Sequence, residues 1–232
     1  MSKRFYENAD IADRGDVFAV ELDGRPVKTP AGKPLAVANR ALAQALADEW
    51  QAQGDKIDPK AMPLTGMINT ALDRTTIERP AMVQSVLRFA ETDLLCYRAE
   101  SPADLVDLQH TTWQPVLDWA DERFGVQLTV TSGILPVKQP QAALVVLEKA
   151  LGEFADLEFT ALASLSAACG SLILALALAH GHIDADQAFA ASELDHDYQA
   201  QHWGTDDEAV ARQRALRSDL AVANGILLYL RE

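Results

Sequence analysis

The sequence predicts an α+β fold in which a small N-terminal β-meander subdomain is followed by a larger C-terminal α-helical domain. Alternating apolar residues on either side of Asp23-Gly24 indicate strands near the N-terminus. Apolar residues then recur at spacings of three and four through most of the chain, which is typical of helices. Pro59 and Pro63 interrupt the pattern between these regions. We therefore expect a β-rich subdomain with one helix over residues 1–62 and a helical domain over residues 63–232.

The first subdomain is predicted to be a three-stranded meander covered by one helix. A strand over 17–22 leads into the Asp23-Gly24 turn, a returning strand covers 25–29, and a third covers 35–37. Three short strands need a partner to pack against. A helix that begins after the N-cap candidate Asn39 supplies it, with an apolar face formed by Leu42, Leu46 and Trp50.

The segment after residue 62 is expected to begin irregularly and then become helical. Residues 62–65 are predicted to be an irregular connector, and Pro80 to occupy the first turn of a helix that ends near Arg98. A second helix opens at Ser101-Pro102, is kinked or broken near Pro115, and stops at Gly125.

The last hundred residues are predicted to hold a buried helix and a C-terminal helical pair. Residues 127–130 form a short strand or linker before a helix that starts near Pro140. Residues 161–179 form one helix of the core, since small residues interrupt their apolar run. Asp184 caps a helix that reaches Trp203 and ends at Gly204, and Thr205 with Glu208 begins the last one.

Composition excludes several classes of function. Asp and Glu number 34 against 20 Lys and Arg, so the formal charge of -14 disfavours nucleic acid and anionic membranes as partners. Cys96 and Cys169 lie far apart, outside any CxxC motif, and are predicted to be packing thiols. The first residues lack an apolar leader and no membrane insertion is expected, so we predict a cytoplasmic protein.

No pattern of a catalytic or cofactor site stands out. The glycines form no phosphate-binding loop and no serine lies in a G-x-S-x-G motif, so we expect no cofactor and no enzyme activity. The Asp/Glu/His cluster over 195–208 leaves a metal-assisted hydrolase as an alternative, although its spacing lacks a second helical ligand pair. The row Glu193, Asp197 and Gln201 is interpreted either as a solvated helix face or as a recognition stripe beside aromatic residues.

Several strings along nearly the whole chain resemble the alpha-subunit assembly chaperones of the ATP synthase catalytic head, a family of mitochondria and related bacteria. They are Arg4-Phe5-Tyr6, residues 22–30, Glu49-Trp50 with Gln53, residues 62–65 and 92–99, the set Gln109, Trp113, Pro115, Trp119 and Arg123-Phe124-Gly125, Gly170-Ser171, Tyr198-Gln199 and Trp203-Gly204. Gln114 and His196 stand where the family more often has an acidic residue. The departure at His196 puts the local charge in question rather than the fold.

The resemblance implies a chaperone that is a monomer when free. It would bind the unassembled alpha subunit of ATP synthase and prevent its aggregation until the beta subunit replaces it, in the bacterial cytoplasm or, for eukaryotic relatives, in the mitochondrial matrix. A general holdase for many clients remains an alternative. We predict that the partner-binding residues are Glu193, Asp195, Asp197, Tyr198 and Trp203, because acidic groups steer association and aromatic groups anchor it. The hairpin over 23–28 is a second candidate surface.

Overall fold

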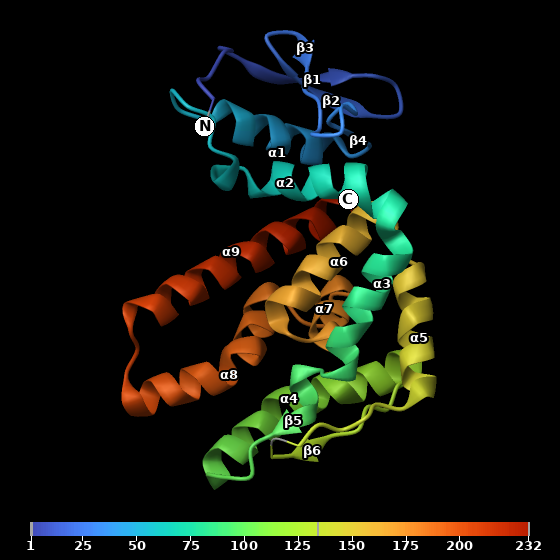
Figure 1. The fold of residues 1–232 in the computed structure, drawn as a ribbon, viewed down its shortest axis with the longest axis vertical. Helices are drawn as coiled ribbons and strands as arrows, with labels where there is room; N and C mark the ends of the chain where they lie inside the picture. The colour runs from blue at the N-terminus through green and yellow to red at the C-terminus, as the bar shows by residue number, and fades with distance from the viewer. Residues whose placement is uncertain (1, 134, 232) are drawn as a thin grey trace. The chain divides into compact units, whose positions relative to one another are not determined.

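The computed structural model describes residues 2–133 and 135–231, which divide into two compact units. Unit 1 comprises residues 2–79, 156–161 and 225–231, and unit 2 comprises residues 80–155 and 162–224 apart from residue 134. A few short strands near the N-terminus and a helical remainder confirm the predicted α+β class (Figure 1). The boundary expected after residue 62 falls inside unit 1, because the helix that follows packs on the first helix of the chain.

Unit 1 contains a four-stranded antiparallel sheet centred on β2 (Phe18–Leu22). One side of β2 pairs along its whole length with β1 (Ala9–Asp13), and the other side is shared by β3 (Arg25–Pro26) and β4 (Ala36–Val37). The predicted turn is confirmed, with φ values of 48° at Asp23 and 75° at Gly24. The sequence pattern missed β1 because its residues are small or charged except for Ile11.

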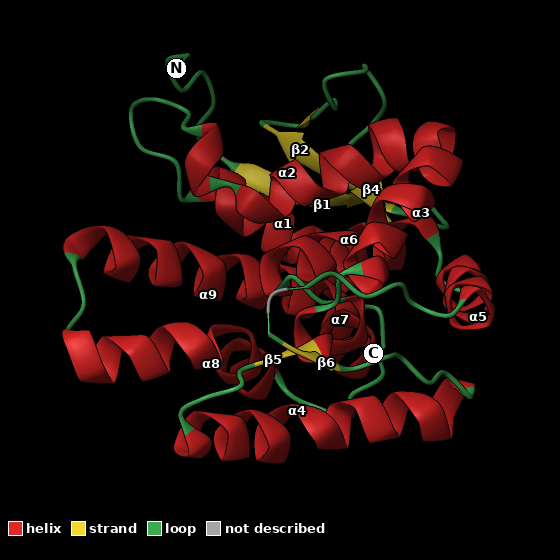
Figure 2. Cartoon of the chain, turned by 60° about the horizontal axis from the view of Figure 1, so that its bottom comes forward, coloured by secondary structure: helices red, strands yellow, loops and turns green. Residues whose placement is uncertain are grey.

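The helix α1 (Arg40–Gln51) packs against this sheet as predicted (Figure 2). The side chain of Asn39 accepts a hydrogen bond from the backbone N–H of Leu42 at 2.8 Å, which confirms it as the N-cap. Leu42 and Leu46 are fully buried. The alternating face of β2 and the apolar face of α1 therefore form the core of unit 1.

A helical run follows the short turn η1 (Pro59–Ala61) and corrects two predictions. It consists of α2 (Pro63–Thr70), the π-helical turn η2 (Ala71–Thr75) and α3 (Thr76–Glu91). The connector expected over 62–65 is wrong because the carboxylate of Glu49 accepts the N–H groups of Leu64 and Thr65, both at 2.8 Å, and so caps α2 from another helix. Pro80 lies inside α3 rather than in a first turn, and the wider turn η2 precedes it.

After α3, which belongs to unit 2 from Pro80 onward, the chain forms a short turn, a two-residue strand and a long helix. The turn η3 (Leu94–Cys96) leads into β5 (Tyr97–Arg98), which pairs in parallel with β6 (Thr131–Ser132). Residues 127–130 are therefore not the strand. The helix α4 (Ala103–Phe124) begins directly after its N-cap Pro102, runs unbroken through Pro115 and ends at Gly125 with a φ of 69°. The predicted start and stop are therefore confirmed, whereas no break occurs at Pro115.

The predicted single helix over 161–179 is two helices, although its burial is confirmed. After α5 (Gln141–Gly152), the chain forms α6 (Asp156–Cys169) and α7 (Leu172–Ala179). The break occurs because Gly170 has a φ of 63° and the Ser171 hydroxyl accepts the N–H of Leu174 at 3.0 Å as an N-cap. Every residue of α7 is buried.

The core of unit 2 is built by α4, α7 and the helix α8 (Ala185–Trp203), which contact one another. Trp113 is fully buried and donates its indole N–H to the backbone carbonyl of Ala191 at 2.8 Å. Among residues 2–133 and 135–231, no helix combines the length and apolar character that a bilayer crossing requires. His182 stacks on Trp119 with ring centroids 5.0 Å apart, so it packs in an aromatic cluster.

Two glycine substitutions test this account of the helix boundaries. Gly170→Ala should lower the free energy of unfolding by about 1–2 kcal/mol because an alanine is strained at positive φ. Gly66→Ala, at an exposed position of α2 with open space around it, should raise it by about 0.5–1 kcal/mol. Urea unfolding monitored by circular dichroism measures both. Equal effects of the two variants would contradict the assignment of Gly170 as the break.

The buried carboxylate of Asp93 predicts a particular pH dependence. Burial raises its pKa to about 6, although the Ser171 hydroxyl and the N–H groups of Ile173 and Leu95 donate to it and oppose the rise. Between its unfolded pKa of about 4 and its folded pKa of about 6, the folded chain holds a proton that the unfolded chain has lost. The contribution of Asp93 to stability is therefore complete below about pH 4 and is lost as the pH rises through about 6.

The variant Asp93→Asn isolates this contribution because it does not titrate. We expect it to be about 1–3 kcal/mol less stable, since an amide cannot accept all three donors. The stability difference from the unsubstituted chain should be largest near pH 4 and smaller above pH 6. Urea midpoints at four pH values measure this difference. A stability difference that grows as the pH rises would contradict this assignment of the Asp93 pKa.

Candidate functional site at the helical hairpin

The residues predicted to bind a partner lie on a helical hairpin made by α8 and α9 (Asp207–Tyr229), of which residues up to 224 belong to unit 2 (Figure 1). Asp184 and Gln187 form a capping box at the start of α8, and Gly204 ends it, as predicted. The last helix is capped by Asp206, whose carboxylate accepts the N–H of Ala209 at 2.7 Å. The capping residue expected at Thr205 is thus one position too early.

Polar side chains join α8 to α9 along the hairpin. Glu193 is only 2% exposed and accepts two hydrogen bonds from the guanidinium of Arg212, at 2.9 and 2.5 Å. This hydrogen bonding raises the pKa of Arg212, which the charge of Asp197 also favours. Asp197 in turn accepts from the amide of Gln213 at 2.7 Å. Acidic side chains of α8 therefore hold α8 and α9 together through hydrogen bonds to α9.

Two further residues of the predicted set join α8 to α4. The carboxylate of Asp195 accepts a hydrogen bond from the side chain of Gln109 at 2.7 Å. The hydroxyl of Tyr198, which is 9% exposed, donates to the carboxylate of Asp104, with oxygen–oxygen distances of 2.9 and 3.0 Å. Burial and this hydrogen bond both raise the pKa of Tyr198.

The five predicted residues therefore share one segment but differ in their surroundings. Glu193 and Tyr198 are buried, Asp195 and Asp197 are half-buried, and Trp203 is 78% exposed. The row Glu193, Asp197 and Gln201 is not a uniformly solvated face, since its first member pairs inside the hairpin. Tryptophan, by contrast, is one of the residue types enriched among the few side chains that dominate the binding energy of protein interfaces.

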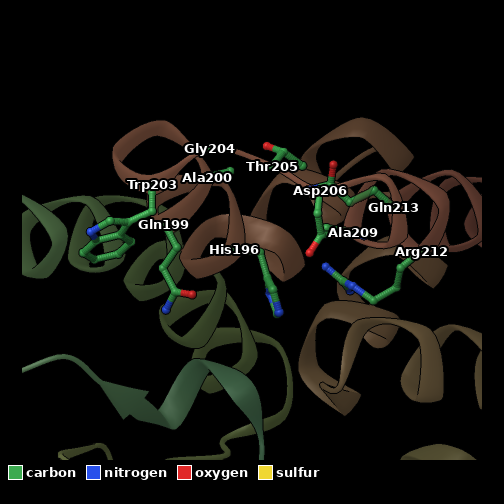
Figure 3. Close-up of a pocket in the computed structure, with 10 residues that line it drawn as sticks. All are labelled: His196, Gln199, Ala200, Trp203, Gly204, Thr205, Asp206, Ala209, Arg212 and Gln213. Carbon is green, nitrogen blue, oxygen red and sulfur yellow. Dashed lines mark hydrogen bonds between the residues drawn. The ribbon is translucent and has the colours of Figure 1, made fainter.

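A pocket of about 260 Å³ lies beside Trp203 at the tip of the hairpin. Figure 3 shows Trp203 and Gln199 on one side of the pocket, Arg212 and Gln213 on the other, and His196 between them. The connecting residues 204–206 complete its wall. A shallow space between an indole and polar groups suits a side chain of another protein.

The arrangement offers no set of metal ligands. Within residues 2–133 and 135–231, no group of three or more His, Cys, Asp or Glu side chains could hold a metal ion. Asp195 and Asp197 instead accept hydrogen bonds from Gln109 and Gln213. The metal-assisted hydrolase considered from the sequence therefore lacks its ligands, and we do not propose it further.

The two cysteines are packing residues, as the sequence indicated. Cys96 and Cys169 are both buried and unpaired. Burial raises the pKa of each thiol to about 12, an effect that the nearby Asp93 carboxylate reinforces. The thiols remain protonated at neutral pH and are poor nucleophiles.

Three groups that hold the site in place were not predicted as site residues, although Gln109 is among the residues that carry the family resemblance. Asp104, Gln109 and Arg212 hold Tyr198, Asp195 and Glu193 in place. Their partners are 19 to 94 residues away along the chain, so no local spacing reveals the contact. Only the charged side chains present on both α8 and α9 indicated that some of them would pair between the two helices.

Comparison with known proteins decides the family. The sequence model described as "ATP12 chaperone protein" matches residues 3–121. The chain belongs to the ATP12 chaperone protein family. This confirms the resemblance to the ATP synthase assembly chaperones that the local strings indicated.

Solved and curated ATP12 relatives agree with this assignment. The crystal structure of Atp12 from Paracoccus denitrificans is 37% identical, with a TM-score of 0.92 and 98% of each chain covered. The Atu1473 protein from Agrobacterium tumefaciens is 40% identical, with a TM-score of 0.92 over 98% of this chain and 86% of that one. The mitochondrial protein atp12 of Schizosaccharomyces pombe is 26% identical over 219 residues, covering 89% of this chain and 75% of its own.

The ion pair at the centre of the hairpin can be tested by removing its cation. Arg212→Met should lower the free energy of unfolding by about 1–3 kcal/mol, because it leaves the buried Glu193 carboxylate unpaired. The effect is not larger because the Arg212 side chain is partly in solvent, which screens the ion pair. Arg214→Met, at an exposed position of the same helix, should change it by less than about 0.5 kcal/mol. Chemical unfolding of both variants measures this. Indistinguishable stabilities would show that the pair does not fasten the hairpin.

Proposed function

We propose that this ATP synthase assembly chaperone binds the unassembled alpha subunit and prevents its aggregation until the beta subunit takes its place. We further propose that it acts without catalysis, as a monomer when free, in the bacterial cytoplasm. The observation that supports this best is Trp203, a tryptophan 78% exposed at the end of a helix in which Glu193 and Tyr198 are buried and hydrogen-bonded to neighbouring helices. Leaving an indole in water is unfavourable, and its burial by a partner is the gain that binding provides.

The surroundings of Trp203 suit a protein partner with basic groups. Asp206, Asp207 and Glu208 follow it on the surface, and the whole chain carries a formal charge of -14. Negative charge around an aromatic anchor accelerates encounter with a basic surface and disfavours acidic ones. An indole face also attracts a lysine or arginine side chain.

The five residues predicted from the sequence take different roles in this proposal. Trp203 makes the main contact, and Asp195 and Asp197 add negative charge near it. Glu193 and Tyr198 are buried and act by holding α8 in place. The proposal thus separates contact residues from positioning residues within one helix.

Binding alone explains how such a chaperone works. A protein that binds the folded partner and not its aggregated form stabilises it by mass action, without any nucleotide cycle. Release then requires only that the beta subunit compete for the same surface of the alpha subunit. This function differs from that of a general holdase in the number of clients, because a general holdase would also protect unrelated proteins.

Substitution of Trp203 tests the proposed contact. Trp203→Ala should weaken binding of the purified alpha subunit by about 30-fold or more, since buried tryptophans at interfaces contribute about 2 kcal/mol or more. Gln201→Ala, two residues away and also exposed, should bind as tightly as the unsubstituted chain. Interferometry with immobilised chaperone measures affinity, and circular dichroism checks the fold. Unchanged affinity of a folded Trp203→Ala variant would contradict the assigned contact.

Light scattering of the alpha subunit during dilution from denaturant provides the functional readout. The chaperone should suppress aggregation at a one-to-one ratio, and added beta subunit should release it. Equal protection of unrelated aggregating proteins would favour the general holdase instead.

A further inference from the structure

The outer edge of β1 in unit 1 has the hydrogen-bonding groups of a strand that lacks a neighbour. β1 lies at the end of the sheet, paired with β2 on one side. The hydrogen bonds from Asp23 N–H to the Asn8 carbonyl and from Arg14 N–H to the Val17 carbonyl show that even-numbered residues of β1 direct their backbone groups toward β2. Asp10 and Ala12 therefore turn their backbone groups toward β2, and Ala9, Ile11 and Asp13 turn theirs outward.

One outward position is already filled by a side-chain amide that imitates a strand. The carbonyl oxygen of the Gln51 side chain accepts the N–H of Ala9 at 2.7 Å, and its amide nitrogen donates to the carbonyl of Glu7 at 3.3 Å. A residue of a parallel neighbouring strand would bond to the same two groups, one on either side of residue 8. Gln51 ends α1, so this substitute covers only the first position of the edge.

The next outward groups remain available for pairing. No other strand of the described residues pairs with this side of β1. Ile11 is half-buried on the face that contacts α1, while Asp10 and Asp13 are exposed. An open edge of this kind accepts an extended segment by continuing the sheet.

The charge of the edge favours one kind of occupant. Residues 7–16 contain four acidic side chains at intervals of three, Glu7, Asp10, Asp13 and Asp16, and all four are exposed. Arg14 is the one basic residue of this stretch, and it forms an ion pair with Glu21. A second copy of β1 would bring like charges together, which disfavours self-pairing. A segment that carries lysine or arginine would be attracted.

We propose that the open edge of β1 binds an extended segment of the alpha subunit with basic side chains, which adds a strand to the sheet. This inference rests on the proposed function, since it assigns a second contact to the same client. The main-chain groups of Ile11 supply the bonds, and the carboxylates of Asp10 and Asp13 supply selectivity. Strand addition shields an aggregation-prone segment because it satisfies the backbone groups that would otherwise pair with another client molecule.

Hydrogen exchange resolved to single amides tests the proposal on the unsubstituted chain. When the alpha subunit is bound, the N–H of Ile11 should exchange at least about 100-fold more slowly than in the free chain. The N–H groups of Asp10 and Ala12, already bonded to β2, should change far less. Alpha-subunit binding with an unchanged Ile11 amide would overturn this inference and leave the proposed function standing. Failure of the alpha subunit to bind at all would contradict both.

Two substitutions at Ile11 provide an independent measurement. Ile11→Pro removes an outward N–H that does not bond to β2, and it should weaken binding of the alpha subunit by about 10-fold. Ile11→Val keeps the N–H and a similar side chain, and it should bind normally. Equal affinity of both folded variants would overturn the proposal. If the proline variant does not fold, the exchange experiment decides alone.

The same exchange experiment identifies a different occupant. If the Ile11 amide is protected in the free chain and this protection fades on dilution, β1 pairs with a second copy. That result would overturn the assignment of the edge to the alpha subunit. Exchange rates that do not depend on concentration are expected.

Discussion

The contact between Glu193 and Arg212 is the constraint on which the hairpin depends. A carboxylate that is 2% exposed is costly to bury unless a cation and hydrogen bonds accompany it. Arg212 supplies both with two bonds from one guanidinium. Because its charge partner lies on the next helix, the pair sets where α9 runs beside α8. The turn at 204–206, and with it the exposed ring of Trp203, takes its position from this pair.

A chaperone built in this way presents a rigid surface rather than an adaptable one. The helix α8 is tied to α9 by Arg212 and to α4 by Asp104 and Gln109, so little conformational entropy is lost when its end is covered. The open edge of β1 is held in a similar manner by α1 and by the Gln51 amide. Both proposed contacts therefore use fixed elements that carry negative charge, which suits a client that must be held and later given up to a competitor.

Local sequence patterns predicted the parts of the fold that local chemistry decides. The Asp23-Gly24 turn, the Asn39 cap, the stop at Gly125 and the bounds of α8 each depend on residues within one turn of one another. The start of α2 depends on Glu49, 15 residues away, and so was missed. The break between α6 and α7 needed Gly170 and Ser171 to outweigh an otherwise continuous apolar run.

The five site residues predicted from the sequence share one segment, but the structure gives them different surroundings. Spacing placed Glu193, Asp197 and Gln201 in one row, yet it could not show which of them a basic residue of the next helix would reach. Burial of Glu193 follows from tertiary pairing alone, which is invisible to periodicity. The exposure of Trp203 is likewise a property of the hairpin tip. Residue type suggested an interface, and the structure shows that Trp203 is exposed while Glu193 and Tyr198 are buried.

The most direct test of the account is the identity of the protein that this chain holds in its own cells. A tagged form would be purified through a moderate salt wash, and the bound proteins identified by mass spectrometry. We expect the ATP synthase alpha subunit without the beta subunit, because we propose that this chaperone and the beta subunit compete for the same surface of the alpha subunit. Recovery of intact ATP synthase, or of many unrelated proteins in place of the alpha subunit, would contradict the account.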